Sequence, residues 1–150
     1  MLLSMDEFRA FEPKKTTYAL FGWPPGHTMS PELPAQLFEA SGQDADYIGV
    51  AGPPEDLPEA FELAKRKLGG INCTIPHKKA VIPLLVDIDT AARDLHSVNT
   101  VRFAAVKVTG FNTDIFAFAG SLNRDGVFRT GLQVLSLGHG RHASRQSFHY

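Results

Sequence analysis

The sequence has a single cysteine, Cys73, among its 150 residues. One cysteine cannot build the disulfide framework of small secreted domains, and this scarcity is typical of a protein of the reducing cytoplasm. An excess of charge of either sign is also missing, since 15 lysines and arginines stand against 16 aspartates and glutamates. This balance argues against a surface for nucleic acid or for an anionic membrane.

Long apolar segments are absent as well. No run approaches the roughly 20 apolar residues that a membrane-spanning helix needs. Residues 1–15 carry three acidic side chains instead of the apolar segment of a signal peptide. Hydrophobic residues still make up 43% of the chain, enough for a core. We therefore expect a cytoplasmic α/β protein of about one domain.

Histidine clusters with metal-ligand spacing are missing too. His139, His142 and His149 lie in a polar tail, without zinc-like spacing and without cysteine partners. We therefore expect no metal site.

Strand-like and helix-like segments alternate in the first half of the chain. Strands are predicted at 16–21, 46–50 and 70–73, and the helices between them at 30–42 and 56–68. Asp56 and Glu59 have the spacing of a capping box at the start of the second helix. This order predicts an α/β fold, a mainly parallel sheet with helices on both faces.

The second half is predicted to hold further short elements. A short helix follows Lys78 and is broken by Pro83, and another helix lies around residues 91–95. Two β-prone runs, 98–103 and 106–109, are close enough to form a hairpin. A helix capped by residues 112–114 and an apolar strand at 132–137 complete the prediction.

Residues 70–79, with the sequence G-I-N-C-T-I-P-H-K-K, are the most informative stretch of the chain. Pro76 forbids continuation of the strand and suits the first turn of a helix. Asn72, Thr74 and Lys78 are therefore expected at the carboxyl end of a strand and on the following turn. Open α/β sheets bind their ligands at this position, and an amide, a hydroxyl and an amine there can hold a polar, hydroxylated molecule.

The pattern around Lys78 leaves two interpretations open. Lysine can act as an acid or base, because its pKa falls when it is desolvated. A solvated helix lysine beside Lys79 is the alternative. His77 is predicted to be a packed or exposed helix residue rather than a catalyst.

Three further polar groups are candidates for ligand binding. Thr28 and Ser30 precede a helix, where hydroxyls and free amides can bind a carboxylate, although Ser30 could simply cap the helix. Asn99 could bind a ligand hydroxyl or only a neighbouring loop. Asp114 could orient and charge-balance a lysine, or could be an acid favoured by the helix dipole.

Together these stretches resemble the shikimate/quinate dehydrogenase family over roughly residues 16–122. The shared motifs are the hydroxyl pair before a proline-started helix, N-C-T-I-P-H-K at 72–78, S-V-N-T at 97–100 and G-F-N-T-D at 110–114. Four motifs in the same order are far more specific than any one of them. The resemblance implies an N-terminal substrate domain followed by a Rossmann domain that binds NADP.

The resemblance also implies roles for individual residues. The reaction would be the NADP-dependent reduction of 3-dehydroshikimate to shikimate, a step of aromatic amino acid biosynthesis. Lys78, paired with Asp114, would transfer the proton. The residues that would bind shikimate, or a quinate-like acid, are Thr28, Ser30, Asn72, Thr74, Asn99 and Asp114.

The end of the sequence departs from the family pattern. Gly138 and Gly140 resemble the start of a cofactor loop, but the glycine spacing is lost from Arg141 onward. We expect a shikimate-binding domain at 1–112, and at 113–150 a linker helix with a truncated or frameshifted Rossmann start. The alternative function is a non-catalytic binding module for shikimate-like acids without a working cofactor site. A homodimer is also possible.

Overall fold

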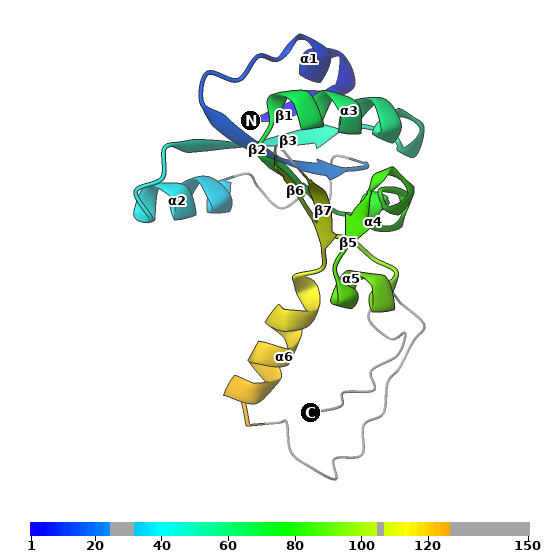
Figure 1. Ribbon diagram of the computed structural model, residues 1–150. Coiled ribbons are helices and arrows are strands. Elements are labelled where there is room, and N and C mark those ends of the chain that lie inside the picture. Colours follow the sequence, from blue (N-terminus) through cyan, green and yellow to red (C-terminus); the bar gives the residue numbers. More distant parts are fainter. Residues whose placement is uncertain (25–31, 105–106, 127–150) are drawn as a thin grey trace.

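A seven-stranded sheet forms the centre of the molecule in the computed structural model, which describes residues 1–24, 32–104 and 107–126 (Figure 1). The strands lie in the order β1-β3-β2-β4-β6-β7-β5. Their bounds are β1 Leu2–Ser4, β2 Thr16–Gly22, β3 Ala45–Ala51, β4 Gly70–Cys73, β5 Asp87–Ile88, β6 Thr100–Phe103 and β7 Val108–Phe111. The helices are α1 Met5–Ala10, α2 Glu32–Ala40, α3 Leu57–Lys67, α4 His77–Ala80, α5 Thr90–Leu95 and α6 Asp114–Arg124, with 3-10 turns η2 Pro54–Asp56 and η3 Ile82–Leu84.

The pairing of the strands confirms the prediction of a mainly parallel sheet. Strands β1, β3, β2 and β4 run parallel to one another, and β5 is parallel to β7. Strand β6 is antiparallel to both of its neighbours, β4 and β7. The reversal at β6 brings the start of that strand next to the end of β4.

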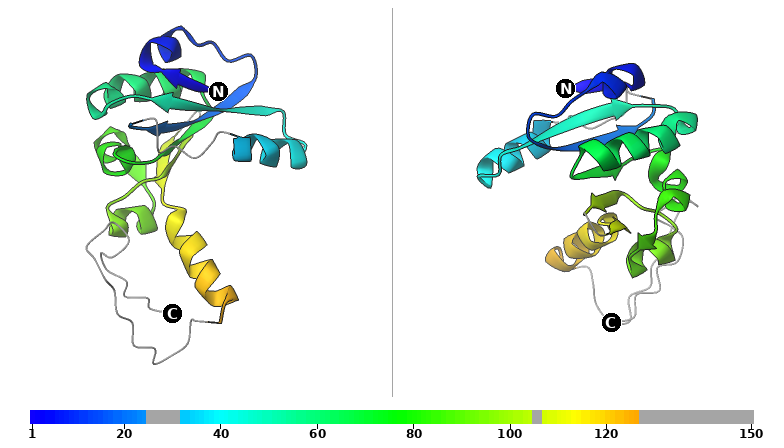
Figure 2. Two further views of the ribbon diagram at one scale, coloured as in Figure 1. Left: turned by 180° about the vertical axis from the view of Figure 1, so that it is seen from behind. Right: turned by 45° about the horizontal axis from the view of Figure 1, so that its top comes forward.

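Helices cover both faces of the sheet, as predicted (Figure 2). The ring of Phe8 in α1 packs edge-on against Phe21 of β2, with ring centroids 5.6 Å apart. On the same strand Tyr18 points to the opposite face, since side chains alternate, and its ring lies 5.5 Å from that of Phe38 in α2. Figure 1 shows α1 and α3 together on one side of the sheet and α2 on the other.

The start of the chain and the start of α3 differ from the prediction. Strand β1 and helix α1 were not expected, and the capping box lies there, between Ser4 and Glu7. The box predicted at Asp56 and Glu59 is wrong. Asp56 already has helical φ and ψ and makes no capping bond with its side chain, whereas an N-cap needs extended backbone. The Glu59 carboxylate instead pairs with Arg9, 2.8 Å away.

The predicted hairpin is confirmed, with its second strand two residues further along than expected. Strands β6 and β7 pair antiparallel, and Ala104 and Lys107 exchange backbone hydrogen bonds of 3.2 and 3.1 Å beside the turn. Helix α5 is capped by Asp89, which accepts a hydrogen bond from the Ala92 amide. The strand predicted at 132–137 lies outside the described residues.

None of the helices in the described part of the chain is long and apolar enough to cross a membrane.

Candidate functional site

Three of the four predicted motifs, N-C-T-I-P-H-K, S-V-N-T and G-F-N-T-D, meet at one edge of the sheet. Strand β4 ends there, and because β6 is antiparallel to it, Thr100 at the start of β6 lies opposite Asn72. Thr100 also pairs with Phe111 at the end of β7, which leads into α6. The chain reversal at β6 therefore brings the end of β4, the start of β6 and the end of β7 to one place.

Lys78 and Asp114 form an ion pair across this edge. The Lys78 Nζ donates to Asp114 Oδ2 at 2.6 Å. Helix α4 is held there because the Lys78 carbonyl accepts a 2.8 Å hydrogen bond from the Val98 amide. Asp114 is the first residue of α6, where the helix dipole favours a negative charge. The side chains of Lys78 and Asp114 are 17% and 35% exposed to solvent, so a small molecule can reach them.

Asn99 lies directly beside the ion pair. Its Nδ2 donates to Asp114 Oδ1 at 2.8 Å and to Thr113 Oγ1 at 3.0 Å. Its Oδ1 accepts from the Thr113 amide and from the Thr100 hydroxyl, at 3.0 and 2.9 Å. Asn99 thus orients the carboxylate that holds the lysine.

Asn72 is joined to the same network from β4. Its Nδ2 donates to Thr100 Oγ1 at 2.9 Å and to the Asn99 carbonyl at 3.2 Å. Its Oδ1 accepts a 2.8 Å hydrogen bond from the hydroxyl of Tyr47 in β3. Burial raises the pKa of Tyr47 to about 12, so the phenol keeps its proton and donates.

The remaining predicted residues are placed only in part. Thr74 is half-buried on the turn after β4, and its amide and carbonyl bond to Phe21 and His77. Its hydroxyl makes no hydrogen bond to another described residue. Four of the predicted residues lie outside the described part of the chain: Thr28, Ser30, Gly138 and Gly140.

Sequence reasoning missed two members of this network, Tyr47 and Thr100. Thr100 belongs to the S-V-N-T motif, but the motif suggested a role only for Asn99. Tyr47 lies in no motif and reaches Asn72 across β2, which separates their two strands. Only the strand order could have indicated it, and that order is not visible in a local pattern.

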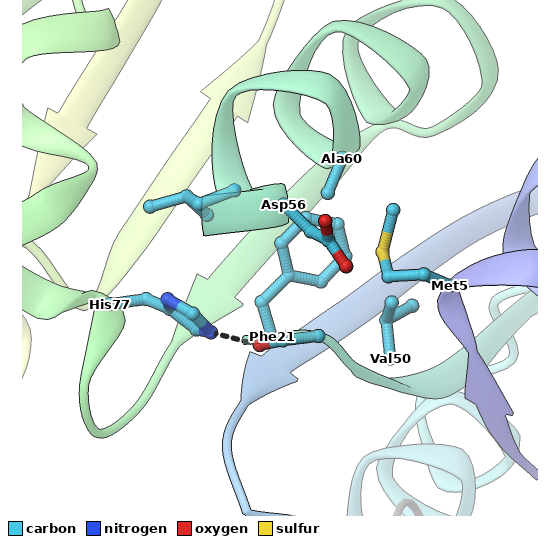
Figure 3. A pocket seen from close by; sticks show the side chains of 8 residues that line it. Met5, Phe21, Val50, Asp56, Ala60 and His77 are labelled. Carbon is cyan, nitrogen blue, oxygen red and sulfur yellow. Dashed lines mark hydrogen bonds between the residues drawn. The ribbon is translucent and has the colours of Figure 1, made fainter. Parts of the chain in front are cut away.

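Away from this site, a pocket lies on the α1 and α3 side of the sheet (Figure 3). Met5, Phe21, Val50 and Ala60 give it an apolar lining, and Asp56 and His77 are polar. The His77 Nε2 lies 2.9 Å from the Gly52 carbonyl, whereas its buried Nδ1 has no partner among the described residues. Burial lowers the pKa of His77, although the bond to Gly52 opposes this. His77 is therefore a packed core residue, which is one of the two environments that the sequence predicted for it.

The arrangement at the sheet edge defines a class of protein. A lysine held by a carboxylate, beside two oriented amides at the carboxyl end of a parallel strand, suits a domain that binds a small hydroxylated molecule and moves one of its protons.

Comparison with known proteins identifies the family. Residues 20–101 match the family model described as the shikimate dehydrogenase substrate binding domain, and the chain belongs to this family. Over 130 residues it is 42% identical to an NADP-dependent shikimate dehydrogenase of Geobacter metallireducens, a match that covers 85% of this chain and 45% of the relative.

Solved structures agree with this assignment. The shikimate dehydrogenase of Aquifex aeolicus superposes with a TM-score of 0.70 at 36% identity, covering 76% of this chain and 43% of that one. Shikimate 5-dehydrogenase of Thermus thermophilus, solved in complex with NADP(H) and shikimate, has a TM-score of 0.70 at 31% identity, covering 75% and 43%. The chain thus spans less than half the length of these relatives.

Proposed function

We propose that this chain is the shikimate-binding part of an NADP-dependent shikimate dehydrogenase, which interconverts 3-dehydroshikimate and shikimate. The observation that carries the proposal is the 2.6 Å ion pair between Lys78 and Asp114, set among oriented amides at the carboxyl end of β4. The relative solved with shikimate and NADP(H) supports the choice of ligand.

Lys78 is proposed as the residue that transfers the proton. An ammonium has three hydrogens, and the described contacts of Lys78 use one of them, on Asp114. Another can therefore point at the oxygen of a bound ketone or alcohol. In the reduction the ammonium gives this proton to the ketone oxygen as it becomes an alcohol and is left as the neutral amine. In the reverse reaction the neutral amine accepts the proton of the alcohol, and the carboxylate 2.6 Å away stabilises the positive charge that forms.

The substrate-binding roles rest on the same geometry and, for Thr28 and Ser30, which lie outside the described residues, on the family resemblance. Asn72, Thr74, Asn99 and Asp114 are proposed to hold the ring hydroxyls, and Thr28 with Ser30 the carboxylate. The exposed fraction of Asp114 and Lys78 leaves room for such contacts. A quinate-like acid offers the same carboxylate and hydroxyls and is the alternative ligand.

The cofactor would be bound outside this domain. We propose a boundary at residue 112, with α6 as the connection to a dinucleotide-binding domain. The described residues contain no glycine-rich turn between a strand and a helix that could take a pyrophosphate, so they do not fit NADP by themselves. Hydride transfer therefore falls to a second domain, and the residues described here deal only with the substrate and its proton.

Two broader proposals concern the surroundings of the protein. Among the described strands β1 is at the edge of the sheet and pairs only with β3, and its Leu2 is exposed, which supports a homodimer through this edge. The free, buried Cys73 and the near-neutral charge support a cytoplasmic protein without nucleic-acid or membrane partners.

Calorimetric titration with shikimate, and separately with NADP, tests the proposed function. The wild-type chain should bind shikimate, and Lys78→Ala should weaken that binding at least about tenfold, because charged hydrogen bonds contribute roughly 1.5–3 kcal/mol. The exposed neighbour Lys79 provides the control. Lys79→Ala removes the same charge one residue away and should leave binding unchanged.

The outcomes separate the two candidate functions. Shikimate binding without NADP binding supports a substrate domain that needs a second domain for turnover. Restoration of turnover when a separate cofactor domain is added supports the enzyme, and failure to restore it supports the binding module. A chain that binds no shikimate at all refutes the proposal.

A further inference from the structure

The hydrogen bonds at the site form one chain that runs in a single direction. It begins at Tyr47, whose hydroxyl donates to Asn72 Oδ1. This phenol can serve as a donor throughout the physiological range, because burial raises its pKa to about 12.

The middle of the chain passes through Thr100. Both hydrogens of Asn72 Nδ2 are used, one on Thr100 Oγ1 and one on the Asn99 carbonyl. The Thr100 hydroxyl accepts from Asn72 and has a single hydrogen, which it donates to Asn99 Oδ1 at 2.9 Å. A threonine hydroxyl therefore joins the two asparagine amides.

The chain ends on the ion pair. Asn99 Nδ2 donates to Asp114 Oδ1, and Lys78 donates to the other oxygen of the same carboxylate. Every donor along the path points toward Asp114, and bonds aligned in this way polarise and strengthen one another. Reversal of either amide would place two donors or two acceptors face to face.

The chain fixes what Asn72 can offer to a ligand. Its two hydrogens are spent inside the protein, and only the second lone pair of Oδ1 is left. Asn72 can thus accept a hydrogen bond from a ligand hydroxyl but cannot donate one to a ligand carbonyl.

We infer that Tyr47 and Thr100 are positioning residues of the substrate site, which hold Asn72 as an acceptor for one ligand hydroxyl and align Asn99 on Asp114. This inference rests on the proposed function and deepens it. It assigns roles to two side chains and states the chemistry that one subsite recognises.

Thr100→Val tests the link, because it removes the hydroxyl and keeps the shape of the side chain. We expect it to weaken shikimate binding by about five- to tenfold in calorimetry. This is the effect of losing about one hydrogen bond between the protein and the ligand. Three shikimate analogues, each lacking one ring hydroxyl, are titrated in parallel. The analogue without the hydroxyl that Asn72 accepts should lose less affinity on Thr100→Val than shikimate does, because only the alignment of Asn99 is then left to be lost.

Two results decide between positioning and general structural damage. Thr100→Ser should restore binding, because it restores the hydroxyl. If Thr100→Val weakened shikimate and all three analogues equally, or if serine gave no rescue, the inference would be overturned.

Tyr47 is tested with Phe and with the double variant. Tyr47→Phe and Thr100→Val both act through Asn72, so the double variant should lose less affinity than the product of the two single losses. Strictly multiplicative losses would mean that Tyr47 acts independently, and would overturn its assignment. Tyr18→Phe is the matched control, since Tyr18 lies opposite Tyr47 in the β2–β3 register.

A readout without ligand separates this inference from the proposed function. Tyr47 does not touch Asn99, yet the chain couples them through Asn72 and Thr100. Tyr47→Phe should therefore shift the NMR resonances of the Asn99 side-chain NH2, and Tyr18→Phe should not. Failure of shikimate to bind, together with this shift, would refute the function and leave the hydrogen-bond chain intact. An unshifted Asn99 resonance refutes the chain.

Discussion

The thiol of Cys73 at the end of β4 is buried, and burial raises its pKa to about 12, although the charge of Lys78 opposes the shift. Compared with the ordinary value of 9.0, this leaves about a thousandfold less thiolate at a given pH. Since only the thiolate is nucleophilic and the buried thiol is also shielded from the reagent, we predict that Cys73 reacts with a thiol reagent at pH 8 by orders of magnitude more slowly in the native chain than in denaturant. Absorbance of the released thiol measures both rates. Equal rates would show that the end of β4 is open to solvent.

At the same scale, the sequence indicated network residues that lie in motifs, with the exception of Thr100, and missed Tyr47, which lies in no motif. Lys78, Asn99 and Asp114 were recognised from short patterns, and the structure brings them into direct contact. Tyr47 was missed because its partner is defined by the order of strands in space. A side chain that reaches across an intervening strand leaves no periodic signal in the sequence.

Among the elements, the contact between β4 and β6 depends on Gly70. A Cβ at this position would lie 2.7 Å from the Val101 carbonyl oxygen, which is backbone and cannot move without separating the two strands. We predict that Gly70→Ala lowers the free energy of unfolding by about 1–3 kcal/mol, the usual cost of overpacking. The midpoint of urea unfolding, at an unchanged slope, measures the loss.

Gly120 provides the matched control within α6. A Cβ there meets no atom of the described residues within 4 Å, and an alanine is a better helix former than a glycine. Gly120→Ala should therefore raise the free energy of unfolding by about 0.5–1 kcal/mol. If the two variants changed stability alike, the clash at Gly70 would not be the cause of its effect.

Element types were predicted well where periodicity was strong, and the details of helix starts less well. The capping box expected at Asp56 failed because Pro54 begins a 3-10 turn, so that the backbone is already helical when it reaches Asp56. Spacing alone cannot reveal the conformation of the residue that precedes a helix. Strands β1 and β5 were missed because two or three residues are too few for a periodic pattern.

For the whole molecule, the sequence predicted the alternation of strands and helices but could not give the position of β6. Insertion of this antiparallel strand between β4 and β7 places the S-V-N-T motif between the motifs N-C-T-I-P-H-K and G-F-N-T-D. Strand order depends on long-range packing, which no local pattern encodes. The motifs could be recognised separately, and only the sheet shows why they act together.

Stability of the whole chain should depend on pH through His77, which is 2% exposed. Burial lowers the pKa of His77 below its ordinary value of 6.5, so the unfolded chain binds a proton there at a higher pH than the folded chain does. Stability then falls as the pH drops below about 6.5, because protonation favours the unfolded state.

His77→Gln keeps a donor for the Gly52 carbonyl but does not titrate. Its melting temperature should therefore fall less than that of wild type between pH 7.5 and pH 5.5. The exposed His96, changed to Asn to suit its positive φ, should keep the wild-type dependence. Equal pH dependence in all three proteins would exclude His77 as the source.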